Sequence, residues 1–398
     1  MKATLSVVEL VHGGEALARH DGRVIFLRGA APGDVVEVEL TGEGRFEHAR
    51  TLKVLQRGAA RVDAPCPIVE RCGGCPVQHV SYEAQLAAKE ELTWDALERI
   101  GGFPRGSYEA AKIVRSPSEF QYRRRARLHR IGNAWGFSQR GENRIEPVQE
   151  CLLFEPLLQA LTDEVRKHDL PGATDLGLLV GEKHGAVDLR GNVQPKRAEK
   201  LLGKLIKGVT LGSQVFGDPV LASPALPNGA RLRARPDTFA QANRSAVPLL
   251  QAAAQAAIGD AGSVLELFCG SGTLTLPLLG KHEVTAVDTA GPALALLRRS
   301  ADEAKLPVKL IAGDAAEIAA RYTGSPECVL LDPPRTGAAE TMKALQTLKP
   351  KRVVYVSCDA PTLARDAKLL GYRLLKAQPL DLFPQTAHFE IVATLERP

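Results

Sequence analysis

The sequence predicts an α/β protein whose last part is a doubly wound parallel sheet, preceded by a small all-β barrel and a central α+β region. Three observations predict this fold class. Short apolar runs alternate with helix-length stretches from about residue 236, strand-like runs separated by glycine turns fill the first 57 residues, and a cysteine-rich segment opens the stretch between them. The expected domains are therefore 1–57, 58–235 and 236–398.

The composition is that of an ordinary globular protein. The chain has 398 residues, of which 44% are hydrophobic and 24% charged, which suits about two or three domains. Because it has neither an uncharged apolar run of about 18 residues nor a signal-peptide pattern at its start, we expect a cytoplasmic protein that does not enter a membrane. The net charge of +5 permits an acidic partner such as RNA, and nothing in the sequence implies an obligate protein partner.

Residues 1–57 have the pattern of an OB-like barrel. Strand-like runs lie at 6–11, 24–27 and 35–40. Turn residues separate them, namely Gly13–Gly14, Asp21–Gly22, Pro32–Gly33 and Gly42. The charges of this segment are roughly balanced. RNA contact and a purely structural cap are therefore both open for the barrel.

The central region contains a predicted helix from Tyr82 to Ile100 and then an arginine-rich strand. The segment QYRRRARLHR, residues 121–130, holds five arginines and no acid. Arginines interleaved with Tyr and Leu suit phosphate contacts and base stacking, so Arg124 and Arg125 are candidate RNA-binding residues. A solvated face without a partner is the alternative.

Four of the seven cysteines precede the last domain. An odd number of cysteines in an expected cytoplasmic chain argues against a disulfide framework and for metal or catalytic roles. Four thiolates can hold a [4Fe-4S] cluster or a tetrahedral zinc ion, and the spacing does not choose between them; free thiols are the remaining alternative. The candidate ligands are Cys66, Cys72 and Cys75, in CPIVERCGGC, and Cys151.

The last region has five apolar runs that predict the strands of the sheet. They lie at 263–268, 283–288, 308–311, 327–331 and 352–356. The first runs into a glycine-rich turn, FCGSG, where the backbone can approach a ligand closely. Because the turn lacks both the dinucleotide pattern GxGxxG and the lysine of a P-loop, it favours a nucleoside without a pyrophosphate.

Acidic residues end three of these strands. Asp288, Asp314 and Asp332 follow the second, third and fourth strands. In open α/β sheets the ligand lies beyond the carboxyl ends of the strands, where an acid can accept hydrogen bonds from ribose hydroxyls. Each acid alone fits a helix N-cap equally well. Together the three predict a class I S-adenosylmethionine site.

Cys358 ends the fifth strand, on the same rim as Asp332 and Arg335. Uracil C5 is a poor nucleophile until a group adds to C6, and a thiolate that adds there gives an enolate whose C5 can attack the methyl sulfonium. This scheme needs a lowered thiol pKa and a base for the C5 proton. Glu390 is the candidate base, because its apolar neighbours should raise its pKa; a solvent-facing strand residue is the alternative.

The chain resembles the RNA uracil C5 methyltransferase family over nearly all of its length. The resemblance implies an N-terminal TRAM (OB-like) domain, a central domain and a C-terminal Rossmann-like class I methyltransferase domain. The motifs that carry it are FAQAN (239–243), ELFCGSGTLTLP (266–277), DPPRTG (332–337), YVSCDAPTLARD (355–366) and FPQTAHFE (383–390).

The resemblance also implies the roles of single residues. Cys358 is implied as the nucleophile and Glu390 as the base that takes the C5 proton. Phe239 and Arg335 would position the target base. The implied S-adenosylmethionine-binding residues are Gln241, Phe268, Asp288, Asp314 and Asp332.

Ribosomal RNA members of the family carry a [4Fe-4S] cluster on the same cysteine pattern. The resemblance therefore favours an iron-sulfur cluster over zinc, with a structural role, and 23S rRNA over tRNA as the substrate. Two positions depart from the family. Cys358-Asp359-Ala360-Pro361 stands where Cys-Asn-Pro is usual, and Asp288 stands where Glu is common. The first departure changes the loop beside the thiol.

Two alternatives to a 23S rRNA enzyme are a tRNA 5-methyluridine methyltransferase and a catalytically silent, RNA-binding iron-sulfur protein. The presence of both Cys358 and Glu390 argues against the silent protein. A cytosine C5 methyltransferase also needs a thiol, but the segments FPxTxHxE and DPPR favour uracil. The target uridine has to leave any base stack to reach such a pocket, which implies base flipping or a loop substrate.

Overall fold

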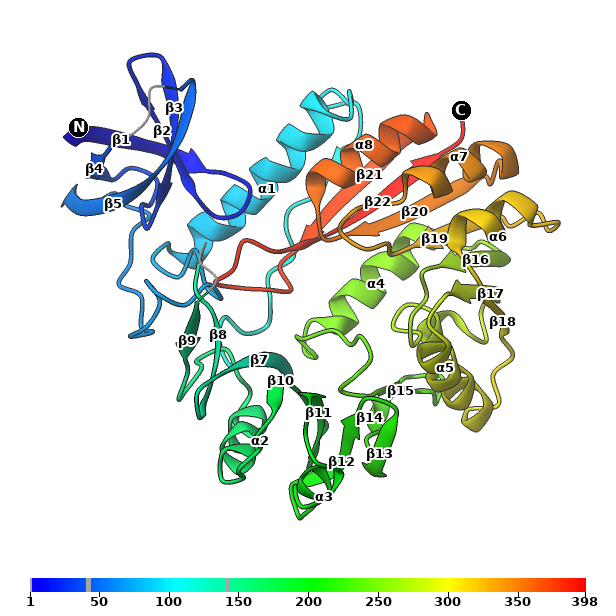
Figure 1. The fold of residues 1–398 in the computed structure, drawn as a ribbon. Coiled ribbons are helices and arrows are strands. Elements are labelled where there is room, and N and C mark those ends of the chain that lie inside the picture. Colours follow the sequence, from blue (N-terminus) through cyan, green and yellow to red (C-terminus); the bar gives the residue numbers. More distant parts are fainter. Residues whose placement is uncertain (1, 41–43, 141–143) are drawn as a thin grey trace.

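The computed structural model describes residues 2–40, 44–140 and 144–398, and Figure 1 shows their arrangement. The N-terminal strands form a closed barrel in the order β1-β2-β3-β5-β4, which confirms the expected barrel. Its apolar residues alternate along the strands and fill the interior. Gly42, a predicted turn residue, lies outside the described residues. The strands are β1 (Lys2–Leu10), β2 (Ala16–His20), β3 (Arg23–Arg28), β4 (Val35–Glu39) and β5 (Phe46–Gln56).

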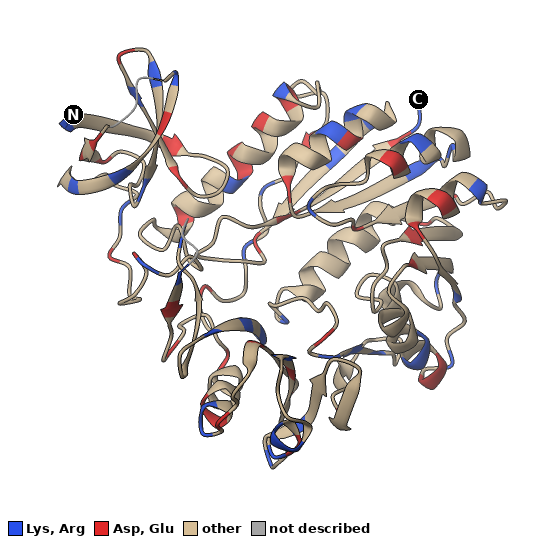
Figure 2. Ribbon diagram, in the orientation of Figure 1, with Lys and Arg blue, Asp and Glu red and all other residues tan. Residues whose placement is uncertain are grey.

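Helix α1 (Tyr82–Arg99) confirms the helix predicted from Tyr82. It runs from beneath the barrel to the C-terminal sheet, where it packs against α8 (Ala360–Leu370) and β21 (Arg373–Leu380) (Figure 1). Figure 2 shows both signs of charge along the helix and on the barrel. One cation of α1, Lys89, is buried.

A second sheet follows α1, in the order β13-β12-β11-β10-β7-β8-β9. Helices α2 (Pro156–Arg166) and α3 (Pro195–Glu199) pack against its strands, and a separate hairpin of β14 (Leu221–Ala225) and β15 (Arg231–Ala234) leads into the last region. The strands of this sheet are β7 (Arg125–Ile131), β8 (Ala134–Ser138), β9 (Ile145–Pro147), β10 (Ala173–Val180), β11 (Gly185–Gly191), β12 (Ile206–Leu211) and β13 (Gln214–Gly217).

The C-terminal sheet has the strand order β18-β17-β16-β19-β20-β22-β21-β6. Strands β16 to β20 are parallel and lie where the apolar runs predicted them. The chain order reverses between β16 and β19, which is where open α/β sheets bind their ligands. The strands are β16 (Ser263–Leu267), β17 (Glu283–Asp288), β18 (Lys309–Ala312), β19 (Cys328–Leu331), β20 (Arg352–Ser357) and β22 (Glu390–Glu396).

The sheet differs from the expected parallel sheet at one edge. β22 pairs antiparallel with both β20 and β21, so the last strand runs back between them. Beyond β21, the short strand β6 (Glu109–Ala110) joins in parallel, although it precedes the second sheet in sequence. The reversal brings the start of β22, at Glu390, next to the end of β20, at Ser357.

Helices cover both faces of the C-terminal sheet. Their apolar residues form two clusters of buried side chains, one on each side of the strands. In the part of the chain that the structure describes, no helix is long and apolar enough to cross a membrane. The remaining elements are α4 (Val247–Ile258), η1 (Leu276–Leu278), α5 (Gly291–Glu303), α6 (Ala315–Arg321) and α7 (Ala339–Leu348).

Candidate active site

The glycine-rich turn after β16 is held by the carboxylate of Asp288. Asp288 Oδ2 accepts the Gly270 N–H at 2.8 Å, and Oδ1 accepts the Ala290 N–H at 2.7 Å. Phe268, the first residue of the turn, has φ +63°, a left-handed conformation that costs a non-glycine residue energy. Gly272 has φ +89°, which strains any other residue, and a Cβ there would lie 2.5 Å from Leu297 Cδ1. Asp288 therefore shapes the turn around the expected cofactor position.

Glu266 lies inside β16, just before the same turn, and is almost fully buried. Burial, together with the nearby charges of Asp332 and Asp288, raises the pKa of Glu266 to about 8. Its Oε2 has no hydrogen-bond partner among the described residues. Our sequence analysis did not single this residue out, although an acid within the otherwise apolar run VLELF was a visible signal.

Asp314 is the N-cap of α6. Its Oδ1 accepts the N–H groups of Ala316 and Glu317 at 2.9 and 3.1 Å, and the residue is exposed. The contacts of Asp314 are therefore those of a helix N-cap, the alternative to a cofactor-binding role. Gln241 is buried in the FAQAN segment, at the entrance to α4.

The arginine run is not simply a solvated face, because two of its arginines bind backbone carbonyls of the FAQAN segment. Arg124 Nε donates to the Gln241 carbonyl at 3.0 Å, and an Arg125 Nη donates to the Ala240 carbonyl at 3.1 Å. Burial lowers the pKa of Arg124 to about 10. The Arg125 guanidinium lies 5.7 Å from the ring centroid of Phe239, which is 68% exposed. These arginines thus support the FAQAN backbone, and Phe239 is the group that faces solvent.

Cys358 follows β20, and Asp359 caps the next helix, α8. Asp359 Oδ1 accepts the Thr362 N–H at 3.0 Å, as an amide oxygen would, so the helix cap survives the change from Asn. The second oxygen lies 3.4 Å from His12 Nε2, at the end of a loop of the barrel. The departure from the family pattern therefore leaves the loop capped and adds a contact to the barrel.

The pKa of the Cys358 thiol is raised to about 11, whereas covalent addition to uracil needs a lowered value. Burial is the largest cause, and the nearby Glu390 carboxyl adds to it. A hydrogen bond and the positive charge of Arg335 oppose the rise. The thiol is therefore protonated at neutral pH in the free protein.

Glu390 and Asp332 form a buried carboxyl pair beside this thiol. Burial and the Asp332 charge raise the pKa of Glu390 well above its usual range, while Arg335 opposes the rise. Burial raises the pKa of Asp332 to about 7. Glu390 is 6% exposed, so it is not a solvent-facing strand residue. Two carboxyls so close do not both ionise easily, and one of them keeps a proton near pH 7.

His388 is a site residue that the sequence analysis quoted but did not assign. An Arg335 Nη lies 2.7 Å from its Nδ1 and 2.9 Å from its Nε2. Partial burial and the Arg335 charge lower the pKa of His388 to about 4, so the ring is neutral at pH 7. The fold thus brings Cys358, Glu390, Asp332 and Arg335 together, with His388 beside them.

The four N-terminal cysteines line one small cavity between the Cys-rich segment and β8. Burial and the neighbouring Cys151 thiol raise the pKa of Cys75 to about 12, and burial also raises the pKa of Cys72 and Cys151. Arg123 lines the same cavity, and its buried Nε has no hydrogen-bond partner among the described residues. Within those residues, no three His, Cys, Asp or Glu side chains converge closely enough to hold a single metal ion.

Comparison with known proteins shows that the chain is similar to RNA methyltransferases. A methyltransferase domain family matches residues 264–348. The 23S rRNA (uracil(1939)-C(5))-methyltransferase RlmD of Pseudomonas putida is 35% identical over 433 residues, which cover 99% of this chain and 94% of that protein. An uncharacterized RNA methyltransferase of Gloeobacter violaceus is 33% identical over 452 residues, with 99% and 96% covered.

A solved structure has the same fold over almost the whole chain. It is that of the Pyrococcus abyssi tRNA (uracil-54, C5)-methyltransferase in complex with S-adenosyl-L-homocysteine. The two superpose with a TM-score of 0.77 and 23% sequence identity, covering 98% of this chain and 99% of the other. The barrel, the second sheet and the C-terminal sheet therefore recur together.

Proposed function

The chain belongs to the RNA uracil C5 methyltransferase family and is an S-adenosylmethionine-dependent enzyme, and we propose that it methylates one uridine of 23S rRNA through Cys358 and Glu390. The observation that carries the proposed mechanism is the meeting of a thiol, a carboxyl of raised pKa and an arginine where β20 and β22 come side by side. The full-length relatives named as 23S rRNA methyltransferases support the choice of RNA.

Cys358 opens the proposed reaction. Its sulfur adds to uracil C6, the electrons move to C5 and the O4 enolate, and C5 takes the methyl group that S-adenosylmethionine supplies. Glu390, whose raised pKa requires that it first give its own proton to water, then takes the proton from C5. The C5–C6 double bond re-forms as the bond between sulfur and C6 breaks. Because the thiol pKa is raised, only a small fraction of the thiol has lost its proton to water before the sulfur adds to C6, and the Arg335 charge stabilises that thiolate.

The cofactor-binding residues of the proposal surround the switch point of the sheet. Phe268 and Asp288 shape the glycine turn there, and Asp332 follows β19 on the other side. Gln241 lies in the FAQAN segment, a few residues before the start of α4. Asp314 keeps a place in the proposal through its position after β18, although its printed contacts are those of a helix cap.

Contact with RNA is assigned to the barrel, residues 1–57, and to the central region beside it. A cavity of about 690 Å³ lies between β5 and the cysteine-rich segment. Several basic residues line this cavity, and they suit contact with phosphate oxygens. Separately, Phe239 offers an exposed ring on which a flipped base can stack. The basic residues of the lining are Arg28, Arg50, Lys53, Arg61 and Arg140.

A [4Fe-4S] cluster held by Cys66, Cys72, Cys75 and Cys151 completes the proposal. The shared cavity supports it, and Arg123 supplies a cation beside the negative charge that four thiolates bring. A cluster is larger than a single ion, so its ligands need not converge on one point. Its proposed role is to tie the Cys-rich segment to Cys151, across the second sheet.

The substrate is tested with unmodified transcripts of 23S rRNA and tRNA, each mixed with enzyme and methyl-labelled S-adenosylmethionine. We expect label in 5-methyluridine of the 23S transcript, at one position, and at least about tenfold less in tRNA. Nucleoside analysis of digested RNA gives the answer. Label in tRNA alone would assign the chain to the tRNA enzymes, and label in neither, from a protein that binds RNA, would support the silent protein.

The cluster is tested by anaerobic purification. We expect iron and sulfide contents of about four per chain, a brown protein, and loss of both on Cys72→Ser. Cys328→Ser, which changes a buried cysteine of β19, should keep the iron. Zinc in place of iron, or neither metal, would remove the cluster from the proposal. If the metal-free protein folded and methylated RNA at the same rate, the cluster would have no structural role.

A further inference from the structure

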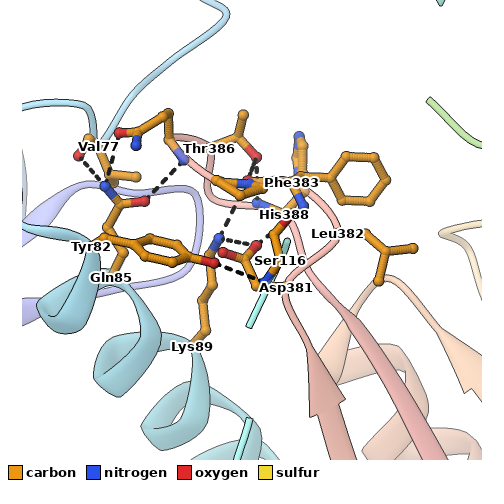
Figure 3. Close-up of polar contacts among 12 residues, drawn as sticks. Val77, Tyr82, Gln85, Lys89, Ser116, Asp381, Leu382, Phe383, Thr386 and His388 are labelled. Atoms are coloured by element: carbon orange, nitrogen blue, oxygen red, sulfur yellow. Dashed lines mark hydrogen bonds and ion pairs between the residues drawn. The ribbon is translucent and has the colours of Figure 1, made fainter. Parts of the chain in front are cut away.

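A buried ion pair joins α1 to the segment that leads into Glu390 (Figure 3). We call this segment, between β21 and β22, the 381–389 turn. Lys89 Nζ donates to Asp381 Oδ1 at 2.7 Å and to the Phe383 carbonyl at 3.3 Å, and the same Asp381 oxygen accepts the Phe383 N–H at 3.1 Å. Lys89 is 3% exposed and Asp381 is 1% exposed. The pair therefore binds both a donor and an acceptor of the turn's backbone.

Stability does not explain this pair well. Moving two charges out of water costs free energy, and this cost offsets much of the attraction between them. A buried ion pair is therefore often no more stabilising than apolar side chains of the same size. Burial lowers the pKa of Lys89, and the Asp381 charge opposes the shift. Asp381 Oδ2 has no hydrogen-bond partner within the described ranges, a further cost. What the pair does supply is a fixed direction and distance between α1 and the turn.

The same helix holds the turn at a second point. Gln85, one helical turn before Lys89, donates to Gln385 Oε1 at 3.0 Å and accepts the Gln385 N–H at 2.9 Å. Gln385 has φ +69°, a left-handed conformation that residues other than glycine seldom adopt. A strained residue of this kind persists only where its surroundings hold it. Gln85 and Lys89 together fix the bend of the turn.

Two further elements bind the backbone of the turn. Tyr122 donates its hydroxyl to the Pro384 carbonyl at 2.9 Å, and Asn243 Nδ2 donates to the Leu382 carbonyl at 3.0 Å. Asn243 lies two residues after Gln241, in the FAQAN segment. The turn is thus held from the helix, from the arginine strand and from the cofactor side of the site.

The 381–389 turn lies next to the groups proposed to react. Glu390 is the first residue after it, and His388 within it touches Arg335, whose charge opposes the rise of the Cys358 thiol pKa. Phe383 lies edge-on to His388, with 6.4 Å between the ring centroids. A shift of the turn would therefore move Glu390 and Arg335 relative to Cys358 at the same time.

We infer that Lys89 is a positioning residue for the methylation reaction, which acts by holding the 381–389 turn so that the Glu390 carboxyl faces the base attached to Cys358. The inference rests on the proposed roles of Cys358 and Glu390. Holding reacting groups in a productive geometry is a large part of catalysis, and a displacement of about 1 Å can cost about 10²-fold in rate. Lys89 itself touches neither the thiol nor the carboxyl.

The test removes both charges at once, so that neither is left buried alone. We expect Lys89→Met/Asp381→Leu to fold, to bind S-adenosylmethionine with unchanged Kd, and to keep KM for RNA within about twofold. Its kcat should fall by about 10²-fold. Because the misplaced base removes the C5 proton slowly, a covalent complex between protein and ordinary RNA should accumulate on denaturing gels. A purely structural role would not produce that complex.

Thr93→Val is the matched control. Thr93 is buried one turn further along α1, and its hydroxyl donates to the Lys89 carbonyl without reaching the turn, so kcat should be unchanged. If the double variant does not fold, Gln85→Met tests the other holding point and should lower kcat by about tenfold, with the same covalent complex.

The inference is overturned if the double variant has a kcat within about twofold of that of the wild type. The same result from a folded Gln85→Met, used in its place, also overturns it. So does a loss confined to the KM for either substrate. Cys358→Ala, measured in parallel, separates this outcome from failure of the proposed function. An active Cys358→Ala enzyme would remove both proposals, whereas an inactive one beside a normal Lys89 variant would remove only the role of Lys89.

Discussion

Glu390→Gln is expected to stop the reaction after methyl transfer, with RNA still attached to the protein. Glutamine has nearly the shape of glutamate but cannot take the C5 proton, and loss of a general base costs about 10²–10⁴-fold in turnover. The steps before proton removal do not use this carboxylate. With labelled RNA and methyl-labelled S-adenosylmethionine, both labels should therefore run together in one protein–RNA band on a denaturing gel.

Glu396→Gln is the control on the same strand. Glu396 lies at the far end of β22, where it pairs with Arg352, so its loss should change neither turnover nor the gel. Wild-type turnover of Glu390→Gln would show that another group takes the proton. A band that carries the RNA label without the methyl label would place the block before methyl transfer.

The raised pKa of Glu390 gives the same substitution an effect on stability. A carboxyl whose folded-state pKa lies above its unfolded value binds its proton more tightly in the folded protein, so stability falls as the pH rises from the unfolded pKa to the folded one. Glutamine does not ionise, so the Glu390→Gln variant loses this dependence of stability on pH. Between pH 5 and pH 8 the Tm of Glu390→Gln should fall less than that of the wild type, because only Asp332 of the pair still ionises.

Cys358→Ala is expected to abolish methylation, by about 10⁴-fold or more, because the proposed reaction begins with addition of this thiol to C6. With 5-fluorouridine RNA, the wild type should form a stable covalent complex, since fluorine at C5 cannot leave as a proton. The complex should be absent from Cys358→Ala. Cys328→Ala, which truncates a buried cysteine of β19, should still form it. A complex in Cys358→Ala would exclude this thiol as the nucleophile.

The rate of complex formation should also depend on pH. With a thiol pKa of about 11, less than about one molecule in 10³ carries a thiolate at pH 7.5. The rate should therefore rise steeply with pH, by up to about tenfold per unit, between pH 7 and pH 9. A rate that is flat over this range would mean that bound RNA lowers the thiol pKa.

Local sequence patterns predicted the strands and the residues at their ends. Parallel buried strands are short apolar runs, so β16 to β20 were visible, and Cys358 and Asp332 followed as strand-end residues. The reversal at β22 and the pairing of β6 with β21 were not visible, because such pairings depend on contacts between distant segments. The predicted central region therefore gave no sign that α1 and β6 pack on the C-terminal sheet.

The electrostatics of the site were harder to predict than its residues. The apolar neighbours of Glu390 correctly indicated a raised pKa, since burial acts through adjacent residues. The raised thiol pKa was not visible in the sequence, because it depends on the burial of Cys358 and on the Glu390 carboxyl that the fold brings near it. Arg124 and Arg125 were predicted to contact RNA, and nothing in the sequence indicated that they bind carbonyls of the FAQAN segment, which lies over 100 residues away.

The contacts that hold the 381–389 turn also bear on the order in which a newly made chain becomes active. Lys89 and Asp381 are 292 positions apart, and Gln85 and Gln385 are 300 apart. Contacts of such long range form late, since the intervening chain has to be ordered first. The turn and Glu390 follow Cys358 in the chain, so the ribosome makes them after the thiol. A nascent chain that contains Cys358 but not yet Glu390 therefore lacks the base that would free it from RNA.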